Sequence, residues 1–156
     1  MDRNQQIDIV NSWMQDLSQV FDTKLELDKD GICTLQVGSD SLAIEVGDHY
    51  PTVGIYGSLM PLPVEDKELS FSLLTRSLEL NAFQIATRGG AIAVAPGGGL
   101  LIYCYSTPIE GLDSEKFSEI FGGFFETLTE LKKILLSPNS NVFKNETGPT
   151  HSFLKG

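Results

Sequence analysis

The feature that most constrains the fold is a series of short alternating segments joined by very short connections. Residues 32–37 and 42–46 alternate between apolar and polar side chains, and a four-residue turn separates them. A third alternating stretch over 53–59 follows another break and ends before Pro61. Because parallel strands need a crossover of a dozen or more residues, this spacing predicts an antiparallel meander with one face on a core. The stretch from Leu25 to Leu27 is a candidate leading strand.

Three longer segments have helical periodicity. From Asn4 to Phe21, apolar residues recur at steps of three and four and share one broad face. A second helix is expected from Glu65 to Asn81, with acidic residues in its first turn that suit the helix dipole. This helix is apolar on more than one side, which indicates that it packs against two surfaces, one of which can belong to another subunit.

A hairpin and a final helix complete the predicted order. Residues 91–95 and 100–105 read as two strands around a glycine-rich turn. The last helix begins at Asp113, a favourable N-cap residue, and runs to about Leu135. Two adjacent glycines, Gly122 and Gly123, lie in the middle of this helix, and each lowers its intrinsic stability by about 1 kcal/mol. We interpret the pair as a point where the helix packs closely against another element.

The predicted fold class is therefore α+β, a single domain with the order α-β-β-β-α-β-β-α and an antiparallel sheet packed with helices. The domain is expected to span residues 1–136. Prolines, glycines and asparagines interrupt any pattern in residues 137–156, which are predicted to form a mobile tail.

Charge narrows the classes of partner. The sequence has 11 basic and 21 acidic residues and a net charge of -10, which repels phosphate backbones and argues against a nucleic-acid partner. The charge can serve solubility alone or can attract a basic segment of a protein partner. The N-terminal residues do not resemble a signal peptide, and no apolar stretch reaches the roughly 18 residues of a membrane span. We expect a cytoplasmic protein that does not insert into a membrane.

The residues that usually carry chemistry are sparse. His49 and His151 are the only histidines, and a metal site needs three or four convergent ligands. Cys33 and Cys104 lie in apolar, strand-like runs and are expected to be free thiols. The run of three glycines at 97–99 precedes a strand instead of a helix, which argues against a phosphate loop. We therefore predict a binding protein that is not an enzyme and has no cofactor or metal; an enzyme or small-molecule sensor is the weakest alternative.

Three stretches together resemble a known family. They are similar to stretches of the class I type III secretion chaperones, the Tir chaperone family. The three stretches are the leucine-rich segment from Leu73 to Asn81, the hairpin over 91–105 and the closing helix that opens at Leu112. The resemblance runs from Ile7 to Leu135. The sequence departs from the family in the glycine-rich turn of the hairpin and in the tail after Ser137.

The resemblance implies a homodimer that holds the N-terminal segments of secreted effector proteins in extended form, in the cytoplasm of a Gram-negative bacterium with a type III secretion system. It implies a dimer interface on the second helix and the following strand, with the residues Leu73, Leu74, Leu78, Ile92 and Val94. Effector-binding candidates on the first helix and the leading strand are Ile9, Leu25 and Leu27. The secretion ATPase is a further implied partner. The alternative is a regulatory or adaptor domain of similar fold.

Overall fold

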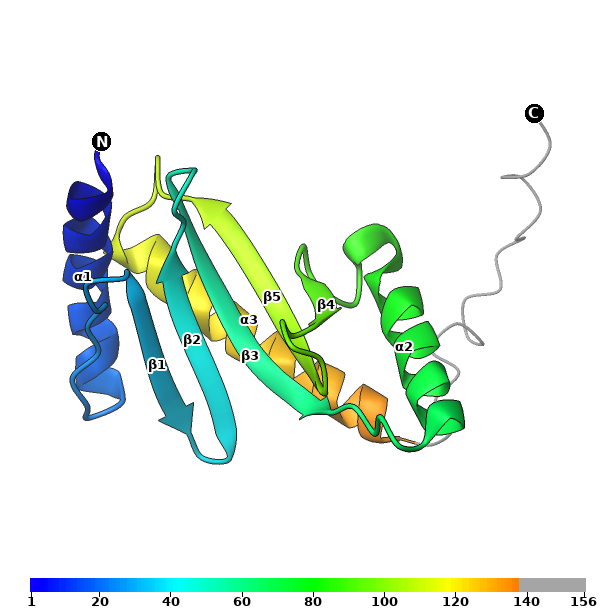
Figure 1. Cartoon of the computed structure of the whole chain (residues 1–156). Coiled ribbons are helices and arrows are strands. Elements are labelled where there is room, and N and C mark those ends of the chain that lie inside the picture. Colours follow the sequence, from blue (N-terminus) through cyan, green and yellow to red (C-terminus); the bar gives the residue numbers. More distant parts are fainter. Residues whose placement is uncertain (138–156) are drawn as a thin grey trace.

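Five strands form one antiparallel sheet, and three long helices pack around it, in the computed structural model, which describes residues 1–137 (Figure 1). The predicted order of elements is confirmed: α1 (Arg3–Val20), β1 (Ile32–Val37), β2 (Asp40–Val46), β3 (Thr52–Pro61), α2 (Lys67–Asn81), a short 3-10 helix η1 (Ala82–Gln84), β4 (Ala91–Val94), β5 (Leu100–Pro108) and α3 (Ser114–Leu136). The tail predicted for residues 137–156 lies, beyond Ser137, outside the described residues.

The strands follow one another in the order β1-β2-β3-β5-β4. The first three strands form the predicted meander, and the hairpin joins it through β5, which pairs with β3 along its whole length. The strand β4 therefore lies at one edge of the sheet and β1 at the other. Alternation along each strand sends one set of side chains to the core. These inward side chains include Cys33, Leu35, Leu42, Ile44, Val46, Val53, Ile55, Leu101 and Tyr103.

One helix covers one face of the sheet, and the other two stand at its two sides (Figure 1). In Figure 1, α3 crosses behind the sheet, α1 stands beside β1, and α2 stands beside β4. Two aromatic pairs join α1 and its end to α3: Trp13 with Phe117, with ring centroids 5.6 Å apart, and Phe21 with Phe121, at 5.8 Å. The opposite face of the sheet carries no helix in the described part of the chain (Figure 1).

An aspartate caps each long helix. Asp113 accepts a hydrogen bond from the backbone N–H of Lys116 at 2.9 Å, as its position in the sequence predicted. Asp66 caps α2 in the same way, so α2 begins two residues later than expected. Asp2 forms a capping box with Gln5 at the start of α1.

The prediction of a leading strand from Leu25 to Leu27 is wrong. The backbone N–H of Leu25 donates to the Ser18 hydroxyl at 2.9 Å, and the N–H of Leu27 donates to the Asn11 side-chain oxygen at 2.8 Å. Both acceptors lie on α1. Side chains of the helix therefore take the place of a neighbouring strand, and this segment stays outside the sheet.

The close-packing interpretation of Gly122 and Gly123 is also wrong within the described chain. A Cβ atom added to either glycine would meet no atom within 4 Å. The close approach between sheet and helix lies instead at Gly57 of β3, where a Cβ would come 2.7 Å from the Leu128 side chain. The helix α3 thus packs on a glycine of the sheet, while its own glycines have open space where a Cβ would stand.

Candidate protein-interaction surfaces

The helix α2 has two apolar sides. Leu73, Ser77 and Leu80 are buried against the rest of the chain. Phe71, Leu74 and Leu78 recur at the i, i+3, i+7 spacing of a second apolar stripe, which we call the outer α2 stripe. The Phe71 and Leu78 side chains are 73% and 70% exposed, and Leu74 is half-buried. An apolar stripe of this spacing on a solvent-facing helix is typical of a surface that packs against another protein.

The connection after α2 extends this apolar surface. Phe83 and Ile85 are both exposed. Phe83, Gln84 and Arg88 have φ angles of 59°, 55° and 46°, in the left-handed region that residues with a Cβ rarely occupy. Each such residue costs about 1–3 kcal/mol, so the surrounding structure must hold the connection in place. Clusters of such residues are common at binding sites.

The structure divides the predicted dimer-interface residues into two groups. Leu73 and Ile92 are each only 6% exposed and belong to the core of the single chain. Leu78 and Val94 are exposed, and Leu74 is half-buried. Only the second group presents apolar surface to a partner.

Asn81 is a structural residue that the sequence analysis did not single out. Its side-chain amide donates to the Ile92 carbonyl at 2.9 Å, and its side-chain oxygen accepts from the Ile92 N–H at 2.7 Å. The strand β4 pairs only with β5 in the described residues, so Asn81 satisfies backbone groups at the open edge of the sheet. The end of α2 is thereby fixed to β4. An asparagine at the end of a helix was visible in the sequence, but its partner eleven residues later was not.

The predicted effector-binding residues do not share one surface. Leu25 and Leu27 lie against the flank of α1 that carries Asn11 and Ser18, and Ile9 is on the opposite flank of that helix. Leu25 and Leu27 are each 5% exposed and belong to the core, which corrects the expectation that they face outward. Ile9 is half-buried and packs against the same core. The hydrogen bonds to Ser18 and Asn11 explain the burial of the leucines, because they hold this segment against α1.

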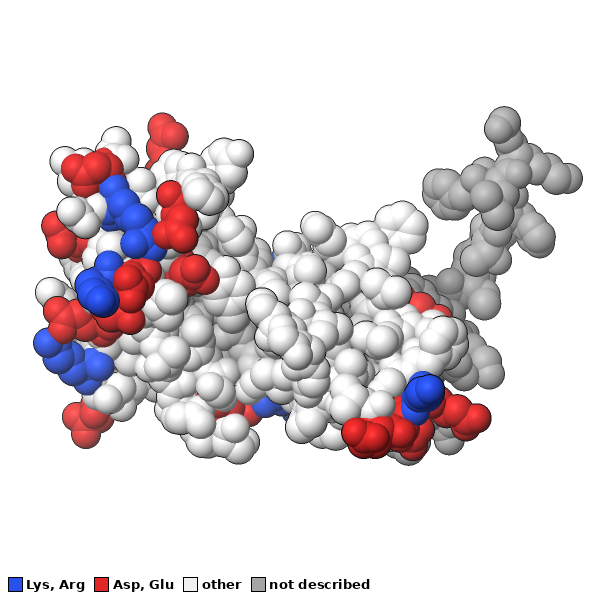
Figure 2. Space-filling model, in the orientation of Figure 1, with Lys and Arg blue, Asp and Glu red and all other residues white. Residues whose placement is uncertain are grey.

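The face of the sheet that carries no helix has little charge in its middle. Figure 2 shows charged side chains at the two ends of this face, with an uncharged region between them. Register places Tyr56, Ile102, Cys104 and Ala93 on this face, and all four are half-buried. Burial raises the pKa of the Cys104 thiol and, with the nearby Glu45 carboxylate, that of the Tyr56 hydroxyl, so both groups are protonated at neutral pH.

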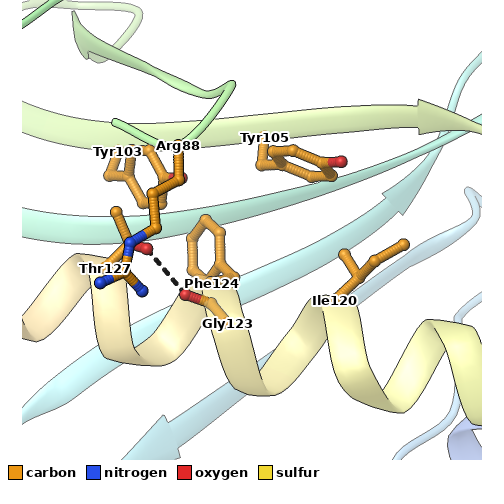
Figure 3. A pocket seen from close by; sticks show the side chains of 7 residues that line it. All are labelled: Arg88, Tyr103, Tyr105, Ile120, Gly123, Phe124 and Thr127. Atoms are coloured by element: carbon orange, nitrogen blue, oxygen red, sulfur yellow. Dashed lines mark hydrogen bonds between the residues drawn. The ribbon is translucent and has the colours of Figure 1, made fainter. Parts of the chain in front are cut away.

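A cavity of about 150 Å³ lies between α3 and β5; we call it the α3 pocket. Figure 3 shows its lining side chains: Arg88, Tyr103, Tyr105, Ile120, Gly123, Phe124 and Thr127. The Tyr103 and Phe124 rings stack with centroids 4.7 Å apart. The Tyr103 hydroxyl donates to the Thr87 carbonyl at 2.7 Å, and burial raises the pKa of Tyr103. The pocket therefore has fixed aromatic walls.

Arg88 lies over the helix at one end of the α3 pocket (Figure 3). Its guanidinium donates to both oxygens of Glu130, at 3.0 and 3.2 Å, and lies 3.6 Å from Glu126. Glu119 lies seven residues before Glu126, on the same side of the helix, and all three glutamates are exposed. Arg88 thus pairs with two of the three carboxylates on this side of α3, and the rim of the pocket is acidic.

The described residues offer no arrangement for metal chemistry. Within residues 1–137, no group of three or more histidine, cysteine, aspartate or glutamate side chains could hold a metal ion. His151 lies outside the described residues, so the expectation that it forms no metal site with His49 stays a prediction. None of the helices in this part of the chain has the length and apolar content to cross a membrane.

Comparison with known proteins identifies related sequences and folds. The sequence pattern of the Tir chaperone protein (CesT) family matches residues 12–132. No protein with a curated description matches the sequence. A chain of the solved ExsC–ExsE complex has a TM-score of 0.67 at 12% identity, with 89% of this chain and all of that chain covered.

Two further solved structures share the fold. A chain of the HopA1–SchA chaperone–effector complex has a TM-score of 0.62 at 18% identity, over 85% of this chain and 99% of that chain. YbjN from E. coli, a proposed transcription regulator, has a TM-score of 0.53 at 15% identity, over 83% of this chain and 87% of that chain. At these identities the structural matches establish the fold alone.

Proposed function

The chain belongs to the Tir chaperone protein (CesT) family, and we propose that it is a cytoplasmic type III secretion chaperone that binds the N-terminal segment of one or more effector proteins in extended form. The match over residues 12–132, which includes all five strands, carries this proposal. By keeping the segment extended, the protein prevents it from folding or aggregating before export. The activity is binding alone, without a cofactor.

The outer α2 stripe supports a homodimer. Its residues together with Phe83 and Ile85 form an apolar surface that the single chain leaves open to water. A monomer seldom exposes so many large apolar side chains on neighbouring elements. We place the dimer contact on Leu74, Leu78 and Val94. The predicted residues Leu73 and Ile92 support this surface from the core.

The strand β1 supports the binding of an extended segment. In the described part of the chain β1 pairs as a strand only with β2. Asp28 already bonds the N–H and C=O of Ile32 at the start of the other edge, so an added strand would pair with the part of β1 beyond Ile32. Ile9 remains a proposed contact on the opposite flank of α1, whereas Leu25 and Leu27 would reach an effector only if their segment left α1. A net charge of -10 favours effector segments that carry lysine or arginine.

Co-purification tests the binding proposal. The chain is co-expressed with the first 100 or so residues of secreted proteins from its own organism, and with the same proteins lacking that region. We expect the N-terminal regions alone to co-purify, without added nucleotide or metal. Binding that requires the folded remainder of the secreted protein would contradict the proposal.

Light scattering tests the dimer. At micromolar concentration we expect about twice the chain mass of 17.1 kDa. The variant Leu78→Asp should be monomeric, because it places a charge within the proposed contact. Ser72→Asp is the matched control: it adds the same charge to an exposed position of α2 outside the outer α2 stripe and should remain dimeric. A monomeric wild-type chain would remove this part of the proposal.

The alternative is a regulatory or adaptor domain that binds a folded protein, and the fold shared with YbjN favours it. A regulator that bound DNA directly would need a basic surface. The charge of this chain has the opposite sign. The co-purification experiment separates the two, because an adaptor should bind a folded partner and not an isolated N-terminal segment.

A further inference from the structure

We propose that the α3 pocket binds one aromatic side chain of the effector segment, from a stretch that also carries lysine or arginine. This inference rests on the proposed chaperone function, since it names the side chain that the effector would place there. The pocket lies between α3 and β5, and none of its lining residues belongs to the outer α2 stripe or to the edge strand β1.

The size and walls of the α3 pocket fit a single ring. Its volume of about 150 Å³ is close to that of an apolar protein cavity known to bind benzene. Tyr103, Tyr105 and Phe124 supply aromatic surface (Figure 3), and aromatic rings favour offset or edge-to-face contacts with one another. The stacked Tyr103–Phe124 pair and the Tyr103 hydroxyl bond hold the walls in place before any ligand arrives.

Gly123 gives the pocket its opening on the helix side. It lies in the middle of α3, where glycine is the least favourable residue after proline. A Cβ at this position would meet no atom of the chain within 4 Å, so internal packing does not require a glycine there. Its lack of a side chain instead leaves room in the pocket, and we infer that an incoming side chain uses this room.

The charge at the rim of the α3 pocket favours particular residues next to the aromatic residue in the effector segment. Arg88 is the one cation among the pocket-lining residues, and Glu119, Glu126 and Glu130 flank the pocket along α3. Arg88 already pairs with two of these carboxylates, so the rim keeps a negative balance. A lysine or arginine next to the aromatic residue would complete the pairing, whereas an acidic neighbour would be repelled.

The pocket is tested first with a defined probe. The full chain, labelled with nitrogen-15, is titrated with the blocked tripeptide acetyl-Lys-Phe-Lys-amide and followed by NMR. We expect saturable shifts of the Gly123, Thr127 and Arg88 amides. The probe with alanine in place of phenylalanine should bind about tenfold more weakly, because it buries no ring. The probe with glutamates in place of lysines should also bind more weakly.

Two leucine variants provide the matched comparison. Gly123→Leu places a side chain in the pocket and should abolish the shifts caused by the phenylalanine probe. Gly122→Leu is an identical change at the adjacent position, which also has open space around it but does not line the pocket. It should leave the shifts unchanged. If Gly123→Leu does not fold, as judged by circular dichroism, Gly123→Ala takes its place with a smaller expected loss.

The same variants are then tested with the co-purified effector segment. Weaker retention by Gly123→Leu than by Gly122→Leu supports the inference, and equal retention overturns it while the chaperone function stands. A wild-type chain that holds no secreted segment refutes the proposed function instead, whatever the tripeptide does. A third outcome would also overturn the inference. If the pocket amides shift when the protein concentration is raised without any probe, and the Phe83→Ser variant loses these shifts, the pocket binds a second copy of the chain.

Discussion

Asn81 allows the arrangement of α2 and β4 to be tested by one substitution. In Asn81→Ala both hydrogen bonds to the backbone of Ile92, at 2.7 and 2.9 Å, are lost. Ile92 is 6% exposed, so its N–H and C=O are left largely without water to replace the amide. A buried group left without a partner costs about 1–3 kcal/mol. We expect the free energy of unfolding to fall by about 2–4 kcal/mol and the melting temperature by about 4–16 °C, from roughly 2–4 °C per kcal/mol.

Asn11→Ala is the matched control, because Asn11 makes one such bond, to the Leu27 N–H at 2.8 Å, and lies within a helix that alanine favours. It should cost less, about 1–2 kcal/mol, because one buried N–H loses its partner and the helix propensity of alanine offsets part of the loss. Urea denaturation measures both variants, and hydrogen exchange should show a faster Ile92 amide in Asn81→Ala. Equal losses in the two variants, or an unchanged exchange rate at Ile92, would refute the role given to Asn81.

Three further predictions concern single groups. Gly122→Ala should raise the free energy of unfolding by about 1 kcal/mol, measured in urea, because the added methyl group meets no atom and alanine favours a helix; a loss of stability would mean that the glycine is needed for packing. The Lys116 N–H lowers the pKa of Asp113, so this cap stabilises the fold above the ordinary carboxyl pKa of about 4 and is lost as pH falls through the lowered value. Asp113→Asn, which can still cap, should therefore flatten the acid side of the stability–pH curve, and an unchanged acid side would contradict this role. Burial raises the pKa of Cys33 and Cys104, so both thiols should react slowly with a disulfide reagent at pH 7 and rapidly in urea; fast native reaction would contradict the burial.

The sequence was sufficient to predict most of the helices and strands, but it did not show most of the contacts between them. Alternation predicted β1, β2 and β3 because each buries one face, and a period of two is visible in six or seven residues. The same alternation misled at Leu25 to Leu27. There the backbone partners are the side chains of Asn11 and Ser18, and no local pattern reports a helix as the partner of an extended segment.

The candidate surfaces show the same limit. The sequence predicted that α2 is apolar on more than one side, but not that Leu73 faces inward and Leu78 outward, since that depends on how the helix is rotated against β4. Similarly, two glycines in α3 predicted a close contact without saying on which side of the helix it lies. The contact inside the chain occurs at Gly57 instead. The α3 pocket joins residues 88 to 127 from three segments and could not be assembled from spacing.

The most direct test of the central claim is native mass spectrometry of the chain co-expressed with the N-terminal segment of a secreted protein. We predict one species with the mass of two chains and one segment, and hydrogen exchange should show the bound segment to be extended, without a fold of its own. A monomeric chain without the segment, or a complex that forms only with the folded, N-terminally truncated partner, would contradict the assignment as a secretion chaperone.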